Sequence, residues 1–165
     1  MTTAAAPDAG GPRPVLLLLS GPNLGLLGER QPEIYGRATL ADHVERARQA
    51  ATRAGCELRH LQSERESDLV EAVHAARGVA DAIVVNAGAL SHSSWALHDA
   101  LAAFDGVVVE LHLSNPDARE PWRRVSVLAP VADGTVAGFG GLGYELAVEA
   151  AARLVAGRSP GRPEA

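Results

Sequence analysis

The sequence predicts an α/β fold in which helices cover both faces of a parallel, doubly wound sheet. Short apolar runs alternate with helical patterns along the chain of 165 residues, and such alternation favours a parallel sheet. The apolar runs are continuous, as in Val15–Ser20 and Ala82–Asn86, which is typical of strands buried on both faces. Five predicted strands joined by right-handed crossovers fit a flavodoxin-like sheet.

In the first half of the chain, two strands and two helices are predicted. The strand over Val15–Ser20 comes first. A helix over Thr39–Ala54 begins at a residue type that caps helices well, and a glycine follows its last turn. Cys56–Gln62 alternates like a strand. Ser67 is the predicted N-cap of the second helix, which runs through Arg77.

The second half continues the alternation. Ala82–Asn86 is a buried strand and Val107–Leu111 is another. Between them a helix opens at Ser93 or Ser94 and runs to about Phe104. These are the third and fourth strands of the predicted sheet.

The chain closes with one more strand and helix. The strand covers Thr135–Phe139 and the helix Leu142–Ala156. The length predicts one domain with a sizeable core. We expect this domain over residues 15–156, with disordered tails over 1–14 and 157–165.

The composition excludes several classes of function. A formal net charge of −5 argues against a nucleic-acid-binding protein, which would carry a basic stripe. All 15 basic residues are arginine. The chain therefore cannot form a lysine Schiff base, anchor a pyridoxal cofactor through lysine or build a P-loop.

The sequence also predicts the cellular location. No apolar run approaches the length of a membrane span. The run Val15–Leu19 behind the N-terminal segment is too short for a signal peptide, so we expect a cytoplasmic protein. The single cysteine, Cys56, lies in a predicted strand with no paired base in the pattern, and is interpreted as a buried thiol.

Three loops that follow strands hold most of the unusual polar residues: 21–37, 87–94 and 112–124. Ligands bind outside the carboxyl ends of such strands, near the switch in strand order, so we expect the site where these loops meet. The first loop, Ser20–Gly36, is long and rich in glycine and proline. It is interpreted as a mobile lid without regular structure. It carries Asn23, Arg30 and Tyr35.

Tyr35 and Arg30 are candidates for a base and its stabiliser. A free tyrosine is ionised in about one molecule in a thousand at pH 7, and a guanidinium held close favours the charged phenolate. Such a phenolate can abstract a proton from a carbon next to a ketone. The residues alone leave a second interpretation open, in which Tyr35 packs on the loop and Arg30 is solvated.

Glu110 and His112 come at the end of a predicted strand and project from the same face. The carboxylate can orient the imidazole and favour its protonated form, which makes His112 a candidate general acid. A capping or core histidine is the alternative. The backbone amides of Leu113 and Ser114 can receive an anion. Three arginines come after these residues, and their guanidinium groups are suited to binding carboxylate or hydroxyl groups. The alternative is that they form a solvated face. They are Arg119, Arg123 and Arg124.

The loop after the third strand offers Asn86 and His92. With His98, Asp99 and His112 in the chain, a metal site is conceivable. However, the metal-binding spacings H-x-x-x-H and H-E-x-x-H are both missing, so no metal is expected. A serine hydrolase is not expected either, because the G-x-S-x-G elbow is missing.

Gly138–Gly143 matches the dinucleotide-binding pattern G-x-G-x-x-G. That fingerprint belongs to the first strand–helix turn of a fold, with an acidic residue about 20 positions further on. Here it precedes the last helix instead. We interpret these glycines as a tight turn with close helix packing rather than a cofactor site.

The loops together resemble those of type II 3-dehydroquinate dehydratase. The resemblance runs from about Val15 to Leu154, in order and without large gaps. Two positions depart from the family's frequent residues, His98 (often arginine) and Val125 (often histidine), and neither is assigned a chemical role. The resemblance rests on five motifs: Gly21–Gly28, Glu33–Gly36, Asn86–Ser94, Glu110–Asn115 and Ala118–Arg123.

This resemblance implies anti elimination of water from 3-dehydroquinate through an enolate. The product is 3-dehydroshikimate, in the shikimate pathway of aromatic amino-acid biosynthesis. Tyr35 is then the base that removes the C2 proton, with Arg30 beside it. Asn23 helps to hold a water against the enolate oxygen. His112 is the acid that protonates the departing C1 hydroxyl, and Glu110 lies behind it.

The resemblance also implies an assembly and no cofactor. Asp99 would reach into a neighbouring subunit's site in a dodecamer of trimers, and neither a metal nor an organic cofactor is needed. The absence of lysine agrees, since the unrelated type I enzyme needs a Schiff-base lysine. The alternative is a flavodoxin-like nucleotide- or flavin-binding module without catalysis. The residues implied to bind the substrate's hydroxyls and carboxylate are Asn86, His92, Leu113, Ser114 and Arg123.

Overall fold

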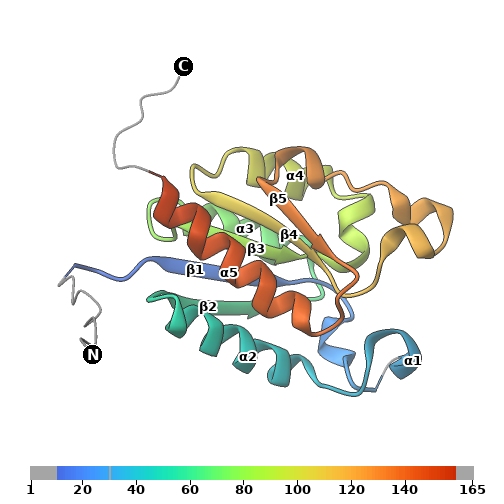
Figure 1. The fold of residues 1–165 in the computed structure, drawn as a ribbon. Helices are drawn as coiled ribbons and strands as arrows, with labels where there is room; N and C mark the ends of the chain where they lie inside the picture. The colour runs from blue at the N-terminus through green and yellow to red at the C-terminus, as the bar shows by residue number, and fades with distance from the viewer. Residues whose placement is uncertain (1–10, 30, 159–165) are drawn as a thin grey trace, which may run out of the picture.

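The structure is a computed structural model that describes residues 11–29 and 31–158. They form a sheet of parallel strands in the order β2-β1-β3-β4-β5 (Figure 1). The order reverses at β1, which pairs with β2 on one side and β3 on the other, so the predicted flavodoxin-like fold is confirmed. The strands are β1 (Val15–Ser20), β2 (Glu57–Gln62), β3 (Ala82–Asn86), β4 (Val107–His112) and β5 (Gly134–Ala137).

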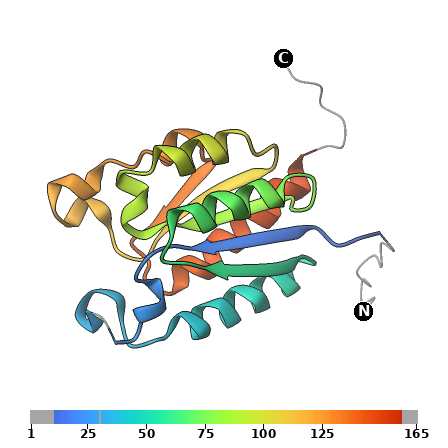
Figure 2. The same ribbon diagram turned by 180° about the vertical axis from the view of Figure 1, so that it is seen from behind.

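Four longer helices cover the sheet, two on each face. α2 (Leu40–Arg53) and α5 (Leu142–Gly157) pack together over the face that Figure 1 turns towards the viewer. α3 (Glu66–Ala76) and α4 (Trp95–Ala102) cover the opposite face, seen in Figure 2. Short helices occupy the connections: η1 (Leu24–Leu26), α1 (Pro32–Tyr35), η2 (Gly88–His92), η3 (Pro116–Ala118), η4 (Pro121–Arg124) and η5 (Ala129–Val131).

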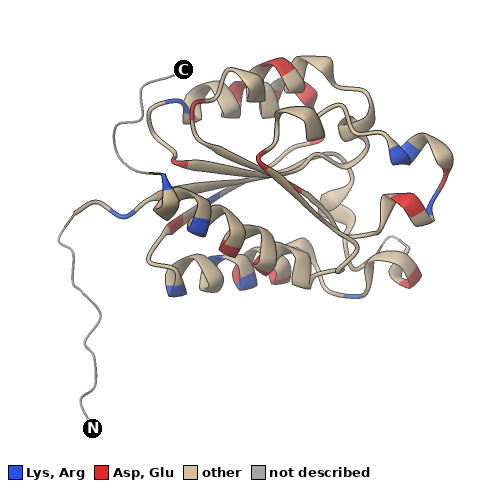
Figure 3. Ribbon diagram, turned by 45° about the horizontal axis from the view of Figure 1, so that its top comes forward, with Lys and Arg blue, Asp and Glu red and all other residues tan. Residues whose placement is uncertain are grey.

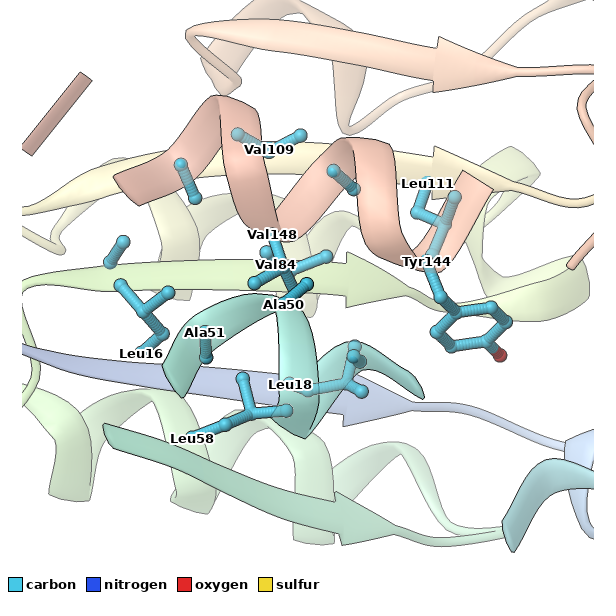
Figure 4. Close-up of a cluster of buried hydrophobic side chains, with 14 of the residues drawn as sticks. Leu16, Leu18, Ala50, Ala51, Leu58, Val84, Val109, Leu111, Tyr144 and Val148 are labelled. Atoms are coloured by element: carbon cyan, nitrogen blue, oxygen red, sulfur yellow. The ribbon is translucent and has the colours of Figure 1, made fainter. Parts of the chain in front are cut away.

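Each face of the sheet has its own hydrophobic core. In β3, Val84 packs into the core beneath α2 and α5, together with Leu18 (Figure 4). Its neighbours Ile83 and Val85 pack into the core beneath α3 and α4. Successive strand residues point to opposite faces, so a continuous apolar run fills both cores. Full burial of one such side chain contributes about 1.5–3 kcal/mol.

Local side-chain chemistry sets the start of two helices. Thr39 caps α2 as predicted, since its hydroxyl accepts a hydrogen bond from the Asp42 amide at 3.2 Å. The Asp42 carboxylate accepts one from the Thr39 amide at 2.8 Å, which completes a capping box. Ser94 caps α4 and accepts a hydrogen bond from the Leu97 amide at 3.0 Å.

Helix α3 begins earlier than predicted. Ser67 was expected to be its N-cap, but the N-cap is Arg65 and Ser67 lies in the first turn. Ser63 organises the turn instead. Its hydroxyl accepts a hydrogen bond from the Arg65 amide at 3.0 Å and donates one to the Asp68 carboxylate at 2.6 Å. Ser63, which lies outside the helix, therefore organises the start of α3 in place of Ser67.

The last strand and helix differ slightly from the prediction. β5 ends at Ala137, two residues early, because Gly138 turns the backbone to a φ of 89°. α5 continues one residue beyond the predicted end, to Gly157. Residues 1–10 and 159–165, which make up most of the two predicted tails, lie outside the described residues.

The G-x-G-x-x-G sequence forms the turn between β5 and α5. Gly138 and Gly140 have φ values of 89° and 56°, a backbone conformation that favours glycine. A side chain at Gly141 would collide with the ring of His43, and a Cβ at Gly143 would lie 3.0 Å from a Leu111 methyl carbon. Turning and close packing therefore account for these glycines, as predicted.

All five strands end at the same edge of the sheet, and α1 and residues 116–124 lie beyond this edge (Figure 1). Acidic and basic residues are interspersed along the helices and loops (Figure 3). Within residues 11–29 and 31–158, no helix combines the length and apolar character needed to cross a membrane.

Candidate active site

A cavity lies at the carboxyl edge of the sheet, where the strand order reverses. It is formed by the loops that follow β1, β3 and β4, as the fold predicted. These loops bring together side chains that are far apart in the sequence. Its lining includes these residues predicted for the site: Asn23, Tyr35, Asn86, His92, His112, Leu113, Ser114 and Arg123.

His112 is the last residue of β4, and buried Glu110 holds its ring. The imidazole Nε2 lies 2.9 Å from Glu110 Oε1, as the two-residue spacing along the strand predicted. The Glu110 side chain is only 1% exposed and the His112 side chain 12%. With Nε2 turned towards Glu110, Nδ1 is the ring nitrogen left for a ligand in the cavity.

Ser126 is a second partner of Glu110 and was not predicted from the sequence. Its hydroxyl donates to Glu110 Oε1 at 2.5 Å. Ser126 Oγ also accepts hydrogen bonds from the backbone amides of Leu128 and Ala129, both at 3.1 Å. Sixteen residues separate Ser126 from Glu110, so only the fold brings them together. Glu110 Oε2 has no hydrogen-bond partner within the described part of the chain.

His92 is held between a backbone carbonyl and two rings. Its Nδ1 lies 2.7 Å from the Val125 carbonyl oxygen. Because a carbonyl only accepts, Nδ1 carries the proton and Nε2 is left for the cavity. The His92 ring stacks on that of His112, with centroids 6.3 Å apart, and meets the Trp122 ring edge-on at 5.4 Å. The ring therefore has a defined orientation.

Tyr35 ends α1, a single helical turn inside the loop Ser20–Gly36. The prediction that this loop lacks regular structure was wrong, since it contains both η1 and α1. Pro32 at the first helical position favours the turn. Gln31 before it and Gly36 after it both have positive φ values, 45° and 81°, so the turn is bounded by backbone reversals on both sides.

Among the described residues, Arg119 contacts Tyr35. Its Nη1 donates a hydrogen bond to Tyr35 Oη at 2.5 Å, and the guanidinium carbon lies 5.4 Å from the ring centroid. The same nitrogen is 3.4 Å from Ser114 Oγ. Arg30, which was predicted beside Tyr35, lies outside the described residues. From the sequence, Arg119 is predicted to recognise carboxylate or hydroxyl groups, and no sequence pattern connects it with Tyr35.

Asn23 and Asn86 contribute amide side chains to the cavity lining. Asn23 has a left-handed φ of 66°, which asparagine tolerates, and its backbone amide donates to Glu64 Oε2 at 2.8 Å. Asn86 is the last residue of β3 and is 3% exposed. Its Oδ1 accepts a hydrogen bond from the Gly88 amide at 3.3 Å. The sheet thus fixes Asn86, and a turn fixes Asn23.

Arg123 also lines the cavity, and its neighbours restrict its side chain. Its Nε lies 2.7 Å from Glu120 Oε2, and its guanidinium carbon lies 4.1 Å from the Trp122 ring centroid. Hydrogen bonds from the Glu120 backbone and from Arg123 lower the pKa of the Glu120 carboxyl. This carboxylate therefore stays charged beside Arg123. Arg124 is exposed and does not line the cavity.

Three predicted residues stand apart from the cavity. Glu110 lies behind His112, and Asp99 is exposed on α4. Cys56 is buried, and burial raises the pKa of its thiol, which agrees with its interpretation as an unreactive thiol. Among residues 11–29 and 31–158, no three His, Cys, Asp or Glu side chains are grouped to hold a metal ion.

The fold and the site together define a class of protein. A phenol bound to a guanidinium and an imidazole bound to a carboxylate line one cavity, at the ligand-binding edge of a doubly wound sheet. Such groups can remove one proton and deliver another to the same bound molecule. The molecule is an α/β enzyme of the acid–base type.

Comparison with known proteins identifies the family. The family described as "Dehydroquinase class II" matches residues 14–152. A 3-dehydroquinate dehydratase from Bacillus licheniformis is 50% identical over 135 residues, which cover 82% of this chain and 93% of that protein. Its counterpart from Parasynechococcus marenigrum is 53% identical over 134 residues, covering 81% and 92%. The chain belongs to the class II dehydroquinase family.

Solved structures agree with this assignment. The type II dehydroquinase from Butyrivibrio crossotus superimposes with a TM-score of 0.82 at 34% identity, covering 85% of this chain and 98% of that one. The type II dehydroquinase from Propionibacterium acnes gives a TM-score of 0.81 at 37% identity, covering 84% and 96%.

Proposed function

We propose that this protein catalyses the dehydration of 3-dehydroquinate to 3-dehydroshikimate. The observation that carries the proposal is the pair of hydrogen bonds at the cavity, Arg119 to Tyr35 and His112 to Glu110. These pairs offer a base and an acid to one bound molecule. Relatives that carry the name 3-dehydroquinate dehydratase support the choice of substrate.

In the first step Tyr35 removes a proton from C2 of the substrate. The electrons of the C2–H bond move towards the C3 ketone and give an enolate. The Arg119 guanidinium, 2.5 Å from the phenol oxygen, stabilises negative charge on Tyr35 before the transfer. We assign Arg30 a supporting role beside it. Asn23, which lines the cavity, holds a water against the enolate oxygen.

In the second step the enolate collapses and the C1–O bond breaks. His112 gives its proton to the departing hydroxyl, which leaves as water, with overall anti elimination. Glu110 is the counter-charge to the imidazolium, at 2.9 Å and shielded from water. Because Glu110 is itself held by Ser126, the acid keeps one orientation. No metal or organic cofactor enters either step.

The remaining polar groups of the lining bind the substrate. Arg123 and the region of Ser114 bind the carboxylate of the substrate. The net charge of the chain is −5, which repels an anion at long range, so positive charge at the site itself must attract the carboxylate. Further contacts to the substrate's hydroxyl groups come from Asn86, His92 and the Leu113 amide.

The wider setting is also proposed from the family. We assign the catalytic domain to residues 15–156 and the protein to the cytoplasm and the shikimate pathway. We further propose a dodecamer of trimers. The exposed position of Asp99 on α4 supports its contribution to a neighbouring subunit's site.

The direct test is to mix the purified full chain with 3-dehydroquinate in the presence of a metal chelator. The product is a conjugated enone, so we expect ultraviolet absorbance to rise. Borohydride should not trap an adduct, since the chain has no lysine to form an imine. Absorbance that stays flat at high enzyme concentration would overturn the proposal. A yellow protein without this activity would point to a flavin-binding module.

A further inference from the structure

A row of four polar groups begins at Asn86, of which Asn86, Ser20 and Tyr144 are buried and His60 is half-buried. Tyr144 on α5 is completely buried, and its Oη lies 3.5 Å from Asn86 Nδ2. Ser20 lies close enough to the Tyr144 hydroxyl to oppose the rise that burial causes in the pKa of Tyr144. Ser20 Oγ in turn lies 3.0 Å from His60 Nε2. Of these four residues, only Asn86 lines the cavity.

The fold brings these groups together from four different elements. Ser20 and Asn86 are the last residues of β1 and β3 and lie directly opposite each other in the sheet. His60 belongs to β2, on the other side of β1. Tyr144 reaches the same place from the first turn of α5, with its hydroxyl beyond the aliphatic side chains of the core (Figure 4). The row therefore ties three strands and a helix to one amide.

The chemistry of the groups sets the direction of the hydrogen bonds. An amide nitrogen only donates, so Asn86 donates to the Tyr144 oxygen. Tyr144 then donates to Ser20, and Ser20 donates to an unprotonated Nε2 of His60. In this direction every hydroxyl donates once and accepts once, as buried polar groups require.

The protonation states of Tyr144 and His60 support this direction. Burial raises the pKa of Tyr144 to about 12, so its hydroxyl keeps the proton that it donates. Burial also lowers the pKa of His60 below its usual value, which keeps Nε2 free to accept. The Tyr144 ring is packed flat against His43, with centroids 5.1 Å apart and planes within 3°, so the hydroxyl is fixed in place.

We propose that Tyr144, held by Ser20 and His60, is a positioning residue that fixes the orientation of the Asn86 amide. The amide has two anchors, since Nδ2 donates to Tyr144 and Oδ1 accepts from Gly88. A flipped amide would place Nδ2 against the Gly88 N–H, so that two donors would face each other and the bond to Gly88 would be lost. The locked amide presents its second N–H to the cavity, so Asn86 binds a substrate oxygen as a hydrogen-bond donor. This inference rests on the proposed dehydratase activity.

Tyr144→Phe tests the proposal because it removes only the hydroxyl and keeps the ring. We expect KM for 3-dehydroquinate to rise about fivefold, which corresponds to one net hydrogen bond, while kcat changes less than about twofold. In an Asn86→Ala background the same substitution should change KM no further, since the group that it positions is gone.

His43→Phe is the matched control, because His43 stacks on the Tyr144 ring but has no hydrogen-bond partner among the described residues. Its KM should equal that of the parent. Thermal unfolding of each variant separates binding effects from loss of folded protein. An active parent with an unchanged KM in Tyr144→Phe, an additive effect in the double variant, or an equal rise in His43→Phe would overturn the inference and leave the activity standing. An inactive parent would overturn both.

Discussion

The two halves of the proposed acid–base machinery are built in different ways. The His112 half belongs to the sheet: Glu110 is 1% exposed and is tied to Ser126. The Tyr35 half belongs to a surface loop, in a helix of four residues of which none is buried. Tyr35 is connected to the rest of the site through Arg119, which comes from a different loop.

The difference shows what fixes the orientation of the proposed acid and of the proposed base. The acid is oriented by the same packing that forms the sheet, so changes around it should affect folding as well as catalysis. The Tyr35 ring packs at the margin of the core beneath α2 and α5, but its hydroxyl is held by a hydrogen bond between two loops, so loss of that hydroxyl or of its partner should affect catalysis alone. Substitutions on the two sides should therefore differ in how they change kcat and the free energy of unfolding.

The largest effect is expected from Tyr35→Phe. Removing a general base lowers kcat by about 10²–10⁴-fold, and KM should change little because the lost interaction belongs to the transition state. The melting temperature should stay within about 1 °C of the parent, since surface changes cost little stability. Steady-state kinetics and a thermal melt measure both. A large loss of stability would show that Tyr35 is part of the core, against the comparison.

Glu110→Ala should lower both kcat and stability. The change leaves His112 and Ser126 without their shared acceptor, and an unpaired buried donor costs about 1–3 kcal/mol of unfolding free energy. We expect kcat to fall on the order of 100-fold through loss of acid orientation. Urea unfolding and kinetics provide the two measurements.

Glu110→Gln is the control for that prediction, because an amide oxygen can still accept from His112 and Ser126. It should fold as stably as the parent yet remain slow, since the counter-charge is gone. Equal loss of stability in both variants would mean that the charge of the carboxylate, rather than its capacity to accept hydrogen bonds, stabilises this side of the site.

Arg119→Ala should lower kcat by about 10–100-fold at unchanged stability, because the guanidinium that stabilises charge on Tyr35 is lost. Arg124→Ala is the matched control: it removes a neighbouring arginine that is exposed and does not line the cavity. Its kinetics should match the parent. If both variants behave alike, the contact between the two loops does not orient the base.

The smallest expected effect is the pH dependence of stability that arises from His43 and His60. Burial lowers the pKa of His43 and His60 from the usual 6.5. Between the lowered values and 6.5 the unfolded chain binds more protons than the folded protein. The contribution of these two histidines to the free energy of unfolding is therefore fully present above about pH 6.5, and it is lost as the pH falls below that value. Urea midpoints at several pH values should show a shallower fall in His43→Phe. An identical slope would contradict this assignment.

The sequence predicted those features that depend on neighbours along the chain. Continuous apolar runs predicted the buried strands, and the two-residue spacing of Glu110 and His112 predicted their contact. Features that depend on distant segments were missed. Arg119 and Tyr35 are 84 residues apart, and no local pattern links them. The place of Arg30 beside Tyr35 stays a prediction, since Arg30 lies outside the described residues. Ser126 was missed for the same reason.

The most direct test of the division between base and acid uses 3-dehydroquinate deuterated at C2, followed by nuclear magnetic resonance in ordinary water. His112→Ala should exchange the deuterium with solvent while forming almost no product, because Tyr35 still makes the enolate but the hydroxyl cannot leave. Tyr35→Phe should neither exchange nor form product. Rapid exchange in Tyr35→Phe, or product formation at the parent rate in His112→Ala, would contradict the account.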